Sequence, residues 1–179
     1  ANVWWLPQPS GYRSSMSSYA CDRGSQGGRD MGPPSDASGA TNAVTCASSL
    51  ETAVIGQWVC EHRDLSIARM VSFRRVVAGT EVNHWWDDGA NAIAFSRGDK
   101  GFVAINGERA PVAATTGTGL AAGTYCDVLT GGKNGTSCAG QSVTVGAAGT
   151  VRWPHAPTAG VPLDTGQRQC CAPPPPASR

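Results

Sequence analysis

The sequence predicts an α+β chain in which one long helix is followed by an antiparallel β-sandwich or barrel. Residues 58–78 carry apolar side chains at helical spacing. Residues 84–105 have the pattern of a β-hairpin, and the chain beyond them consists of short β-forming segments bounded by glycines. Several short strands at this spacing are typical of an antiparallel sandwich or barrel.

The region that precedes the helix contains few regular signals. Val3 to Leu6 is a short apolar run that ends in a proline-rich turn at Pro7-Gln8-Pro9. Residues 21–50 are rich in Gly, Ser, Asp and Pro and show neither strand nor helix periodicity. A loop of this length in a compact domain is functional or disordered, or its packing partners are absent from the chain.

The helix is the best-defined element before the hairpin. Its apolar face is broad, as expected for a helix that packs against a sheet. It consists of Leu65, Ile67, Ala68, Met70, Val71, Phe73, Val76 and Val77. Acidic residues near the start, basic residues near the end and Gly79 after them match the helix dipole and the C-terminal capping preference.

The hairpin consists of two β-forming runs joined by turn residues. Ala90 to Phe95 places Ile93 and Phe95 on one face, and Gly101 to Ile105 is rich in β-formers. Ser-Arg-Gly-Asp-Lys between them supplies the reversal. Further strands are predicted at 125–129, 142–145 and 150–153, with a weaker candidate at 161–163.

Composition and charge narrow the classes of partner. A chain of 179 residues with 40% hydrophobic and 15% charged residues has the composition of a globular protein with a buried core. The net charge is +1 and the sequence contains no basic run. The charge pattern expected of a protein that binds nucleic acid or an anionic membrane is therefore absent. The sequence also lacks a transmembrane run and a signal peptide, so we expect a mature chain or a piece of a longer one.

The seven cysteines are more typical of disulfides formed in an oxidising compartment than of a zinc site. Cys126 and Cys138 flank a turn-rich stretch, and a disulfide that closes a short hairpin fits this arrangement. Zinc requires paired Cys-x-x-Cys or Cys/His clusters, which the sequence does not contain. Asn134-Gly135-Thr136 is a glycosylation sequon in the same turn and agrees with secretion.

Several sequence blocks occur in an order that is typical of one enzyme family. They are Trp58-Val59-Cys60-Glu61-His62-Arg63, Trp85-Trp86-Asp87-Asp88-Gly89, Ile93-Ala94-Phe95, Arg97-Gly98, Lys100-Gly101-Phe102 and Ala122-Gly123-Thr124-Tyr125-Cys126-Asp127-Val128, with weaker matches at Met16-Ser17-Ser18-Tyr19 and Gly32-Pro33-Pro34. As a set, which covers about residues 11–145, they resemble the secreted α-amylases of glycoside hydrolase family 13, in particular the animal and actinobacterial type.

The resemblance implies a two-part architecture. Residues 1–79 would be the last β/α unit of a TIM-barrel catalytic domain, with strand 8, a long loop and helix 8. Residues 80–166 would be the C-terminal antiparallel Greek-key β-sandwich, called domain C, and residues 167–179 a disordered tail. Because a lone β/α unit leaves apolar surface and backbone polar groups exposed, we expect a C-terminal fragment that needs the remainder of the TIM barrel.

The resemblance also implies a mechanism whose reacting groups lie elsewhere. Family members cleave α-1,4-glucans such as starch and glycogen with retention, using a carboxylate nucleophile and a second carboxylic acid, with a third carboxylate assisting. All three come from earlier barrel strands, as do the calcium ligands. No catalytic, cofactor-binding or metal-binding residue is therefore assigned in this chain, and we expect a secreted, extracellular protein that is inactive alone.

Two residue pairs near the hairpin allow more than one interpretation. Asp87 and Asp88 are adjacent on a strand and point to opposite faces, which argues against a catalytic pair. Trp85 and Trp86 either stack on sugar rings, as in a carbohydrate-binding module, or pack domain C against the barrel at the domain junction. Their place directly after the helix favours packing. A non-catalytic carbohydrate-binding β-module and an inactive homologue remain the alternative functions.

Departures from the family pattern concern chloride and the remaining cysteines. Many animal members hold chloride with an arginine on strand 8, where this sequence has Ser14, with Arg13 one residue earlier. A one-residue shift turns a side chain to the other face of a strand, which argues against chloride dependence. The resemblance pairs Cys60 with an upstream cysteine, for which Cys46 is the candidate. It assigns no role to Cys21, Cys170 or Cys171.

Overall fold

The computed structural model consists of two compact units. The first contains residues 1–11 and 69–179, and the second contains residues 12–68. Within them the structure describes residues 6–9, 11, 17–19, 33, 35–48, 52–54, 57–155 and 160–167. The apolar run from Val3 to Leu6 lies outside this range except for Leu6, as do most of the 167–179 tail and residues 21–32 of the long loop.

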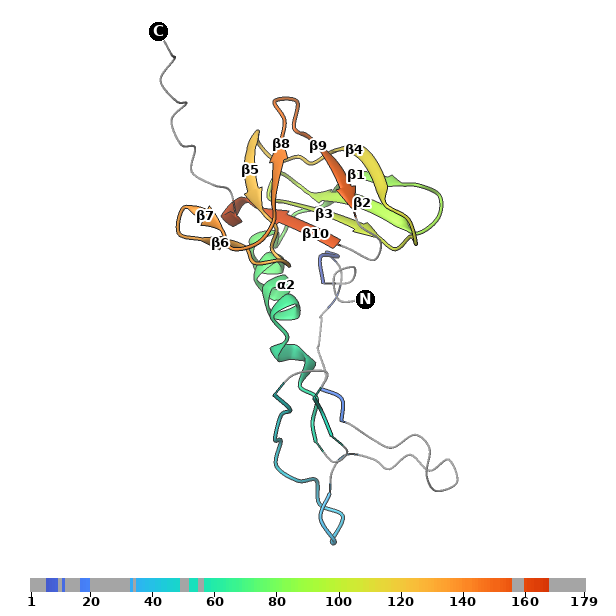
Figure 1. The fold of residues 1–179 in the computed structure, drawn as a ribbon, viewed down its shortest axis with the longest axis vertical. Helices are drawn as coiled ribbons and strands as arrows, with labels where there is room; N and C mark the ends of the chain where they lie inside the picture. Colours follow the sequence, from blue (N-terminus) through green and yellow to red (C-terminus); the bar gives the residue numbers. More distant parts are fainter. Residues whose placement is uncertain are drawn as a thin grey trace. The chain divides into compact units, whose positions relative to one another are not determined.

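An antiparallel sheet of four strands forms one layer of the first unit (Figure 1). Its order is β1 (Val82–Asp87), β2 (Ala92–Arg97), β3 (Gly101–Asn106) and β10 (Gly160–Asp164). The predicted hairpin is confirmed, since β2 and β3 pair from Ala92↔Asn106 to Arg97↔Gly101. The Trp-Trp-Asp block lies in an additional strand, β1, which pairs with the other edge of β2.

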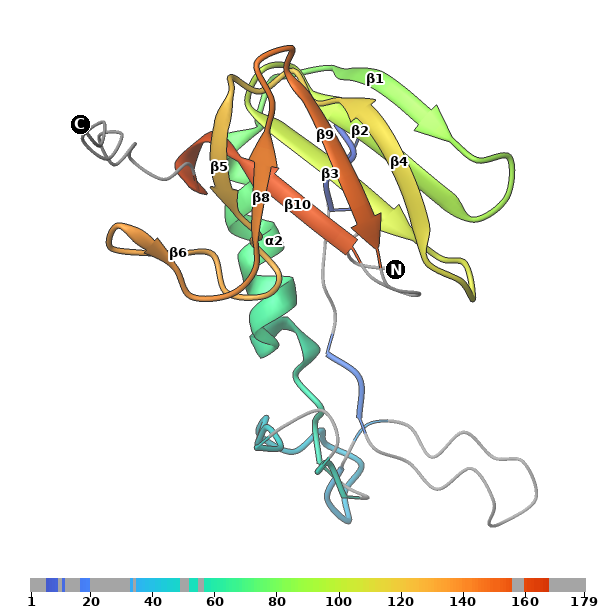
Figure 2. The same cartoon turned by 45° about the horizontal axis from the view of Figure 1, so that its top comes forward.

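Two further strand pairs form the opposing layer, which Figure 2 shows from another side. Two antiparallel pairs join β4 (Val112–Gly117) to β9 (Thr150–His155), and β5 (Gly123–Cys126) to β8 (Ser142–Val145). A small hairpin of β6 (Lys133–Asn134) and β7 (Ser137–Cys138) lies between β5 and β8 along the chain. The expected all-β antiparallel architecture after the helix is therefore present.

The core lies between these layers and uses alternate positions of the strands. Phe102 and Ala104 on β3 and Val161 and Leu163 on β10 face inward, as the two-residue period of a strand requires. The remaining members are Ala94, Leu120, Tyr125, Val145 and Val151. Tyr125 satisfies its buried hydroxyl by donating to the carbonyl oxygen of Ala121, at 2.8 Å.

Helix α2 spans Leu65–Val76 and is shorter than the predicted 58–78. Cys60 has φ 58°, and a single 3-10 turn, η1 (Glu61–Arg63), follows it before the α-helix begins. Asp64 then caps the helix, because its Oδ1 accepts the backbone N–H of Ser66 at 2.9 Å. The helix ends at Val76, before the predicted end at residue 78, and has Arg74 and Arg75 in its last turn and Gly79 at φ 75° after it, as expected.

The described helices are all too short or too polar to cross a membrane.

Candidate functional site

Helix α2 and the four-stranded sheet meet at a glycine. Phe73 and Val77 are fully buried, and a Cβ on Gly101 of β3 would lie 2.4 Å from Val77 Cγ1 and 2.9 Å from Phe73 Cζ. Only a residue without a side chain allows this approach. The C-terminal half of the helix thus packs directly on the outer face of the sandwich.

Two arginines tie residues 6–11 to the same surface. Arg97 on β2 is only 2% exposed and donates to the carbonyl oxygens of Pro7, of Val77 at 3.3 Å and of Thr80 at 2.7 Å. Arg74 on α2 donates to the carbonyl oxygens of Leu6 at 2.9 Å, Gln8 at 2.6 Å and Gly11 at 3.1 Å. Burial, together with the nearby Arg74 cation, lowers the pKa of Arg97 from its ordinary value.

A β-bulge at His84 and Trp85 precedes Trp86, so the two adjacent tryptophans lie in different environments. The register of β1 and β2 shifts between Asn83 and Trp86, so two residues of β1 lie opposite Phe95. Trp86 packs against the core. Trp85 is 52% exposed, stacks on Phe95 with ring centroids 5.8 Å apart, and donates its indole N–H to Asp87 at 2.8 Å.

The adjacent carboxylates of Asp87 and Asp88 organise the turn between β1 and β2. Asp88 Oδ1 accepts the backbone N–H groups of Ala90 at 2.9 Å and Ala92 at 3.0 Å, and these bonds lower the pKa of Asp88. Asp87 accepts the backbone N–H of Gly89 at 3.1 Å besides the Trp85 indole. Both carboxylates thus accept N–H groups of their own turn, and this geometry supports a structural role for the pair.

Two signature blocks that are distant in the sequence meet in the second unit. The carboxylate of Glu61 accepts both the backbone N–H, at 2.8 Å, and the hydroxyl of Ser18. Tyr19 packs edge-on against Trp58, with ring centroids 5.9 Å apart. The Met-Ser-Ser-Tyr and Trp-Val-Cys-Glu segments, which carried part of the family resemblance, therefore form one local arrangement over residues 17–19 and 58–61.

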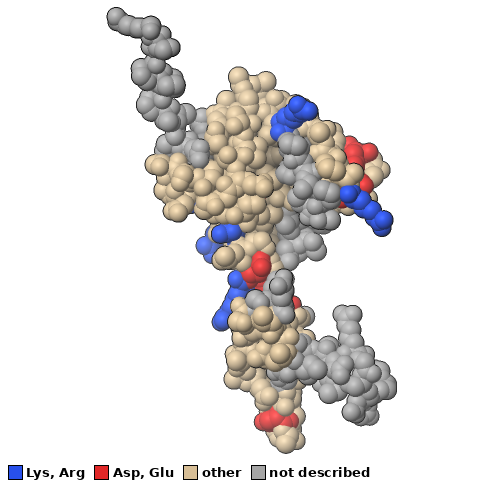
Figure 3. Space-filling view, in the orientation of Figure 1, with Lys and Arg blue, Asp and Glu red and all other residues tan. Residues whose placement is uncertain are grey.

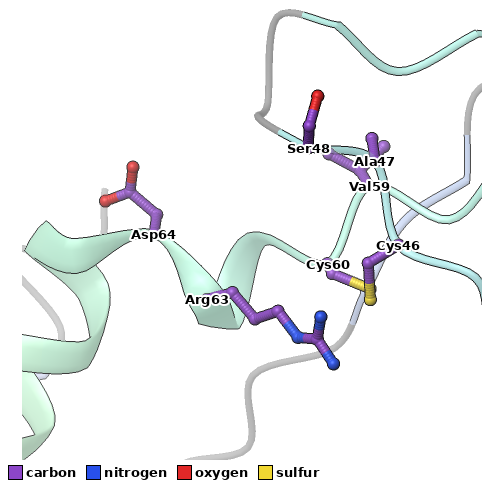
Figure 4. A pocket seen from close by; sticks show the side chains of 7 residues that line it. All are labelled: Cys46, Ala47, Ser48, Val59, Cys60, Arg63 and Asp64. Atoms are coloured by element: carbon purple, nitrogen blue, oxygen red, sulfur yellow. A yellow bond between two sulfur atoms is a disulfide. The ribbon is translucent and has the colours of Figure 1, made fainter.

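A cavity of about 440 Å³ lies beside this arrangement, around the Cys46–Cys60 disulfide (Figure 4). Arg63 and Asp64 supply its charged side chains, and they extend in different directions in the close-up. Ser48 and Val59 complete the rim. Neither a facing pair of carboxylates nor a nucleophile with an adjacent base lines this space, so it has no catalytic constellation of its own.

Both predicted disulfides are present in the structure. Cys126 and Cys138 join β5 to the β6–β7 hairpin with a Cα–Cα distance of 5.2 Å, and Cys46 and Cys60 have a Cα–Cα distance of 5.5 Å. Asn134 lies exposed in the hairpin that the first disulfide anchors. The sequon is therefore accessible to a modifying enzyme, and its glycosylation stays a prediction.

Removal of the Cys126–Cys138 bond should destabilise the sandwich. The bond closes a loop with a sequence separation of 12, for which the loss of chain entropy in the unfolded state corresponds to about 3 kcal/mol. A Cys126→Ala/Cys138→Ala double variant should show this loss in urea unfolding. An unfolding free energy equal to that of the wild type would contradict it.

Asp164 makes stability depend on pH in an unusual direction. It is 1% exposed, accepts the backbone N–H of Gly166 at 2.8 Å, and burial raises its pKa from 3.8 to about 6. The native state therefore binds the proton more tightly than the unfolded state. The contribution of this group to stability is complete below pH 3.8 and is lost as pH rises through about 6.

Asp164→Asn should remove this penalty without changing the shape of the side chain. We expect a gain on the order of 2 kcal/mol in unfolding free energy at pH 7 and almost none at pH 4. Urea unfolding at both pH values measures it. An equal gain at the two pH values would show that ionisation of Asp164 is not the cause.

The described residues do not test the cofactor predictions, which place calcium in the parent enzyme with ligands outside this chain and argue against chloride. The positions of the chloride argument, Arg13 and Ser14, lie outside the described residues. Among the residues that the structure describes, no three His, Cys, Asp or Glu side chains gather as metal ligands. On the face drawn in Figure 3, the acidic and basic side chains are scattered in small groups among uncharged residues.

A family model described as the C-terminal all-β domain of α-amylase matches residues 84–162. This range begins in β1 and ends in β10, so it covers both layers of the sandwich.

Curated relatives extend the similarity beyond the sandwich. The α-amylase of Oryzias latipes is 44% identical over 156 residues, which are 82% of this chain and 29% of the relative. Pancreatic α-amylase 2a5 of Mus musculus is 44% identical over 148 residues, covering 80% of this chain and 28% of the relative. The chain thus spans less than a third of the length of these relatives.

Solved structures agree with the sequence comparison. A crystal structure of an E249Q mutant of α-amylase I from Eisenia fetida, in complex with maltohexaose, superposes with a TM-score of 0.75 and 34% identity. The match covers 92% of this chain and 34% of that chain. The wild-type enzyme from the same organism gives a TM-score of 0.73 over the same coverage.

Proposed function

Because the chain belongs to the α-amylase family and corresponds to the C-terminal portion of the animal-type enzymes, we propose that it is the structural closing piece of a secreted α-amylase. The parent would hydrolyse internal α-1,4-glucosidic bonds of starch or glycogen with retention. The observation that carries the proposal is the packing of Phe73 and Val77 on Gly101, because it joins the helix that resembles barrel helix 8 to the sandwich.

The domain division that we propose is based on the same contact between the helix and the sandwich. Residues 1–79 would complete the barrel, residues 80–166 would form domain C, and residues 167–179 would be a tail. Arg74 and Arg97 support the division, since they bind backbone carbonyls within residues 6–11 from the helix and from the sheet respectively. Domain C would thereby hold both ends of the last β/α unit.

Four carboxylates of the sandwich accept hydrogen bonds from its own backbone, which supports a chain without catalytic residues. Asp87 and Asp88 accept turn N–H groups, and Asp127 and Asp164 are buried with backbone N–H donors from Leu129 and Gly166. A retaining glycosidase needs two carboxyl groups about 5–5.5 Å apart on either side of the scissile bond. In our proposal those groups, and the calcium ligands, come from the remainder of the barrel.

Localisation outside the cell is part of the proposal. Two disulfides and an exposed sequon suit an oxidising, glycosylating route of export. The pancreatic relatives bear names that agree with secretion. Starch or glycogen would be the substrate of the parent enzyme, of which this chain is a part.

A second candidate function rests on the half-exposed ring of Trp85. A flat indole that is fixed by Phe95 and Asp87 is a suitable platform for a sugar ring, as in a non-catalytic carbohydrate-binding module. A junction role, in which Trp85 covers the barrel side of domain C, remains our preferred proposal, whereas the packing of Trp86 against the sandwich core argues against the same role for Trp86.

The isolated chain distinguishes these functions. We expect no hydrolysis of soluble starch and the same low retention on insoluble starch for the wild type and for Trp85→Ala. Val71→Ala is a matched control, because Val71 is also a partly exposed apolar residue, at 40%. Retention that Trp85→Ala abolishes and Val71→Ala preserves would establish the binding module instead, and hydrolysis by the isolated chain would refute the structural proposal.

A further inference from the structure

The sequence contains two Asn-Gly pairs, Asn106-Gly107 and Asn134-Gly135, and the structure places them in opposite surroundings. An asparagine before glycine is chemically labile, because a residue without a side chain lets its own backbone nitrogen approach the side-chain carbonyl carbon of the asparagine. In a folded protein this approach depends on how firmly both residues are held. The two pairs therefore provide a comparison within one chain.

Asn106, at the end of β3, is fully buried and is held at both atoms of its side-chain amide. Its Nδ2 donates to the carbonyl oxygen of Ala110 at 3.0 Å, and its Oδ1 accepts the backbone N–H of Glu108 at 2.8 Å. The backbone nitrogen of Gly107 donates to the carbonyl oxygen of Asn91 at 3.0 Å. Any reaction between the two residues would first have to break these three hydrogen bonds in the interior.

Asn134 is exposed at the end of β6, beside the two-residue turn that leads into β7. Gly135 is the first residue of this turn and has φ +59°, and a Cβ built on it would meet nothing within 4 Å. The structure shows no hydrogen bond between the side-chain amide of Asn134 and any residue that it describes. The side chain of Asn134 and the backbone of Gly135 therefore lie in open space at the tip of the hairpin.

We propose that Asn134 is a modification site at which the folded chain deamidates, and that the fold protects Asn106 from the same reaction. The backbone nitrogen of Gly135 attacks Cγ of Asn134 and forms a C–N bond. The bond from Cγ to the side-chain nitrogen breaks, and ammonia leaves with the proton that the Gly135 nitrogen has lost. One water molecule then opens the five-membered imide ring and gives aspartate or isoaspartate, so water is the only co-reactant.

The reaction changes both the charge and the modification state of the hairpin. It adds one negative charge, so the formal net charge of the chain falls from +1 to zero. It also removes the asparagine of the sequon, because glycosylation needs the same side-chain nitrogen that deamidation releases. The two modifications of Asn134 therefore exclude each other. This inference goes beyond the proposed structural function and does not depend on it.

Incubation of the full 179-residue chain, produced without glycans, at mildly alkaline pH tests the proposal. After reduction of the disulfides, trypsin cleavage at Lys100, Arg109 and Lys133 puts the two asparagines on different peptides, and mass spectrometry follows the gain of about 1 Da on each. We expect Asn134 to react about 100-fold faster than Asn106, because the three hydrogen bonds around Asn106 make its reactive form rare. Both rates should fall at mildly acidic pH, where the attacking nitrogen keeps its proton.

Two variants separate deamidation from other changes of the hairpin. Asn134→Gln should abolish the acidic species in isoelectric focusing, because its longer side chain would have to close a larger ring. Thr136→Ala removes the sequon but keeps the Asn-Gly pair, so the wild-type rate is expected. In guanidinium chloride Asn106 and Asn134 should react at similar rates, because the protection of Asn106 comes from the fold.

Several results would overturn the proposal. Equal rates at Asn106 and Asn134 in the folded chain would show that the surroundings do not select the site. An Asn134 that reacts only in guanidinium chloride would show that the native hairpin prevents ring closure, and an acidic species that persists in Asn134→Gln would assign the modification to another residue. None of these measurements involves starch, so a failure here is distinguishable from a failure of the proposed function.

Discussion

Phe73→Ala should lower the free energy of unfolding of the first unit by about 3–5 kcal/mol. Phe73 is fully buried, and its ring end lies within contact distance of Gly101 on β3. Its truncation would leave a cavity between helix and sheet that a rigid β-strand cannot fill. Urea unfolding followed by tryptophan fluorescence and by far-ultraviolet circular dichroism measures the loss.

The matched control for this variant is Val71→Ala on the same helix. Val71 is 40% exposed, so its truncation should change stability by less than about 1 kcal/mol. If Phe73→Ala lowers the free energy of unfolding no more than Val71→Ala does, the stability of the helix does not depend on the sheet. The contact of Phe73 and Val77 with Gly101 would then not support the proposed function.

Arg97→Met should cost about 4 kcal/mol, because three carbonyl oxygens lose a charged donor in a buried place. The oxygens belong to Pro7, Val77 and Thr80, so the variant should detach both residues 6–9 and the end of the helix from the sheet. Hydrogen exchange should accordingly rise at Val77 and Thr80, besides the loss in unfolding free energy.

Arg75→Met provides the control for the loss of a cation from this region. Arg75 is exposed in the last turn of α2, beside Arg74. We expect a change within about 0.5 kcal/mol and unaltered exchange at Thr80. Equal effects of the two variants would mean that the hydrogen bonds of Arg97 contribute nothing specific.

The sequence predicts the β2–β3 hairpin well because its signals are local. Ile93, Phe95 and the Ser-Arg-Gly-Asp-Lys turn all lie within one short stretch, and pairing follows directly from them. The sequence does not predict strand β1 as a separate element, because the bulge at His84 and Trp85 interrupts its alternation. Strand β4 was missed because Val-Ala-Ala-Thr-Thr-Gly contains only one large apolar side chain.

The start of the helix and the contact between helix and sheet depend on residues that are distant in the sequence, so local patterns do not predict them. Apolar Trp58 and Val59 extend the helical pattern, whereas the positive φ of Cys60 interrupts it where the disulfide to Cys46 forms. The roles of Gly101 and Arg97 depend on residues more than 15 positions away, and arginine is rarely so buried. The family resemblance interprets the helix as barrel helix 8 and the hairpin as part of domain C, but it does not indicate which side chains join them.

A chimeric enzyme tests the central claim most directly. In the α-amylase of Oryzias latipes, the segment that matches this chain, 29% of that protein, would be replaced by this chain, and the hydrolysis of soluble starch measured. We predict that the chimera hydrolyses starch, that the relative without the segment does not, and that Phe73→Ala in the chimera lowers its inactivation temperature. A chimera that is folded but inactive, or a truncated relative as active as the intact one, would contradict a structural closing role for this chain.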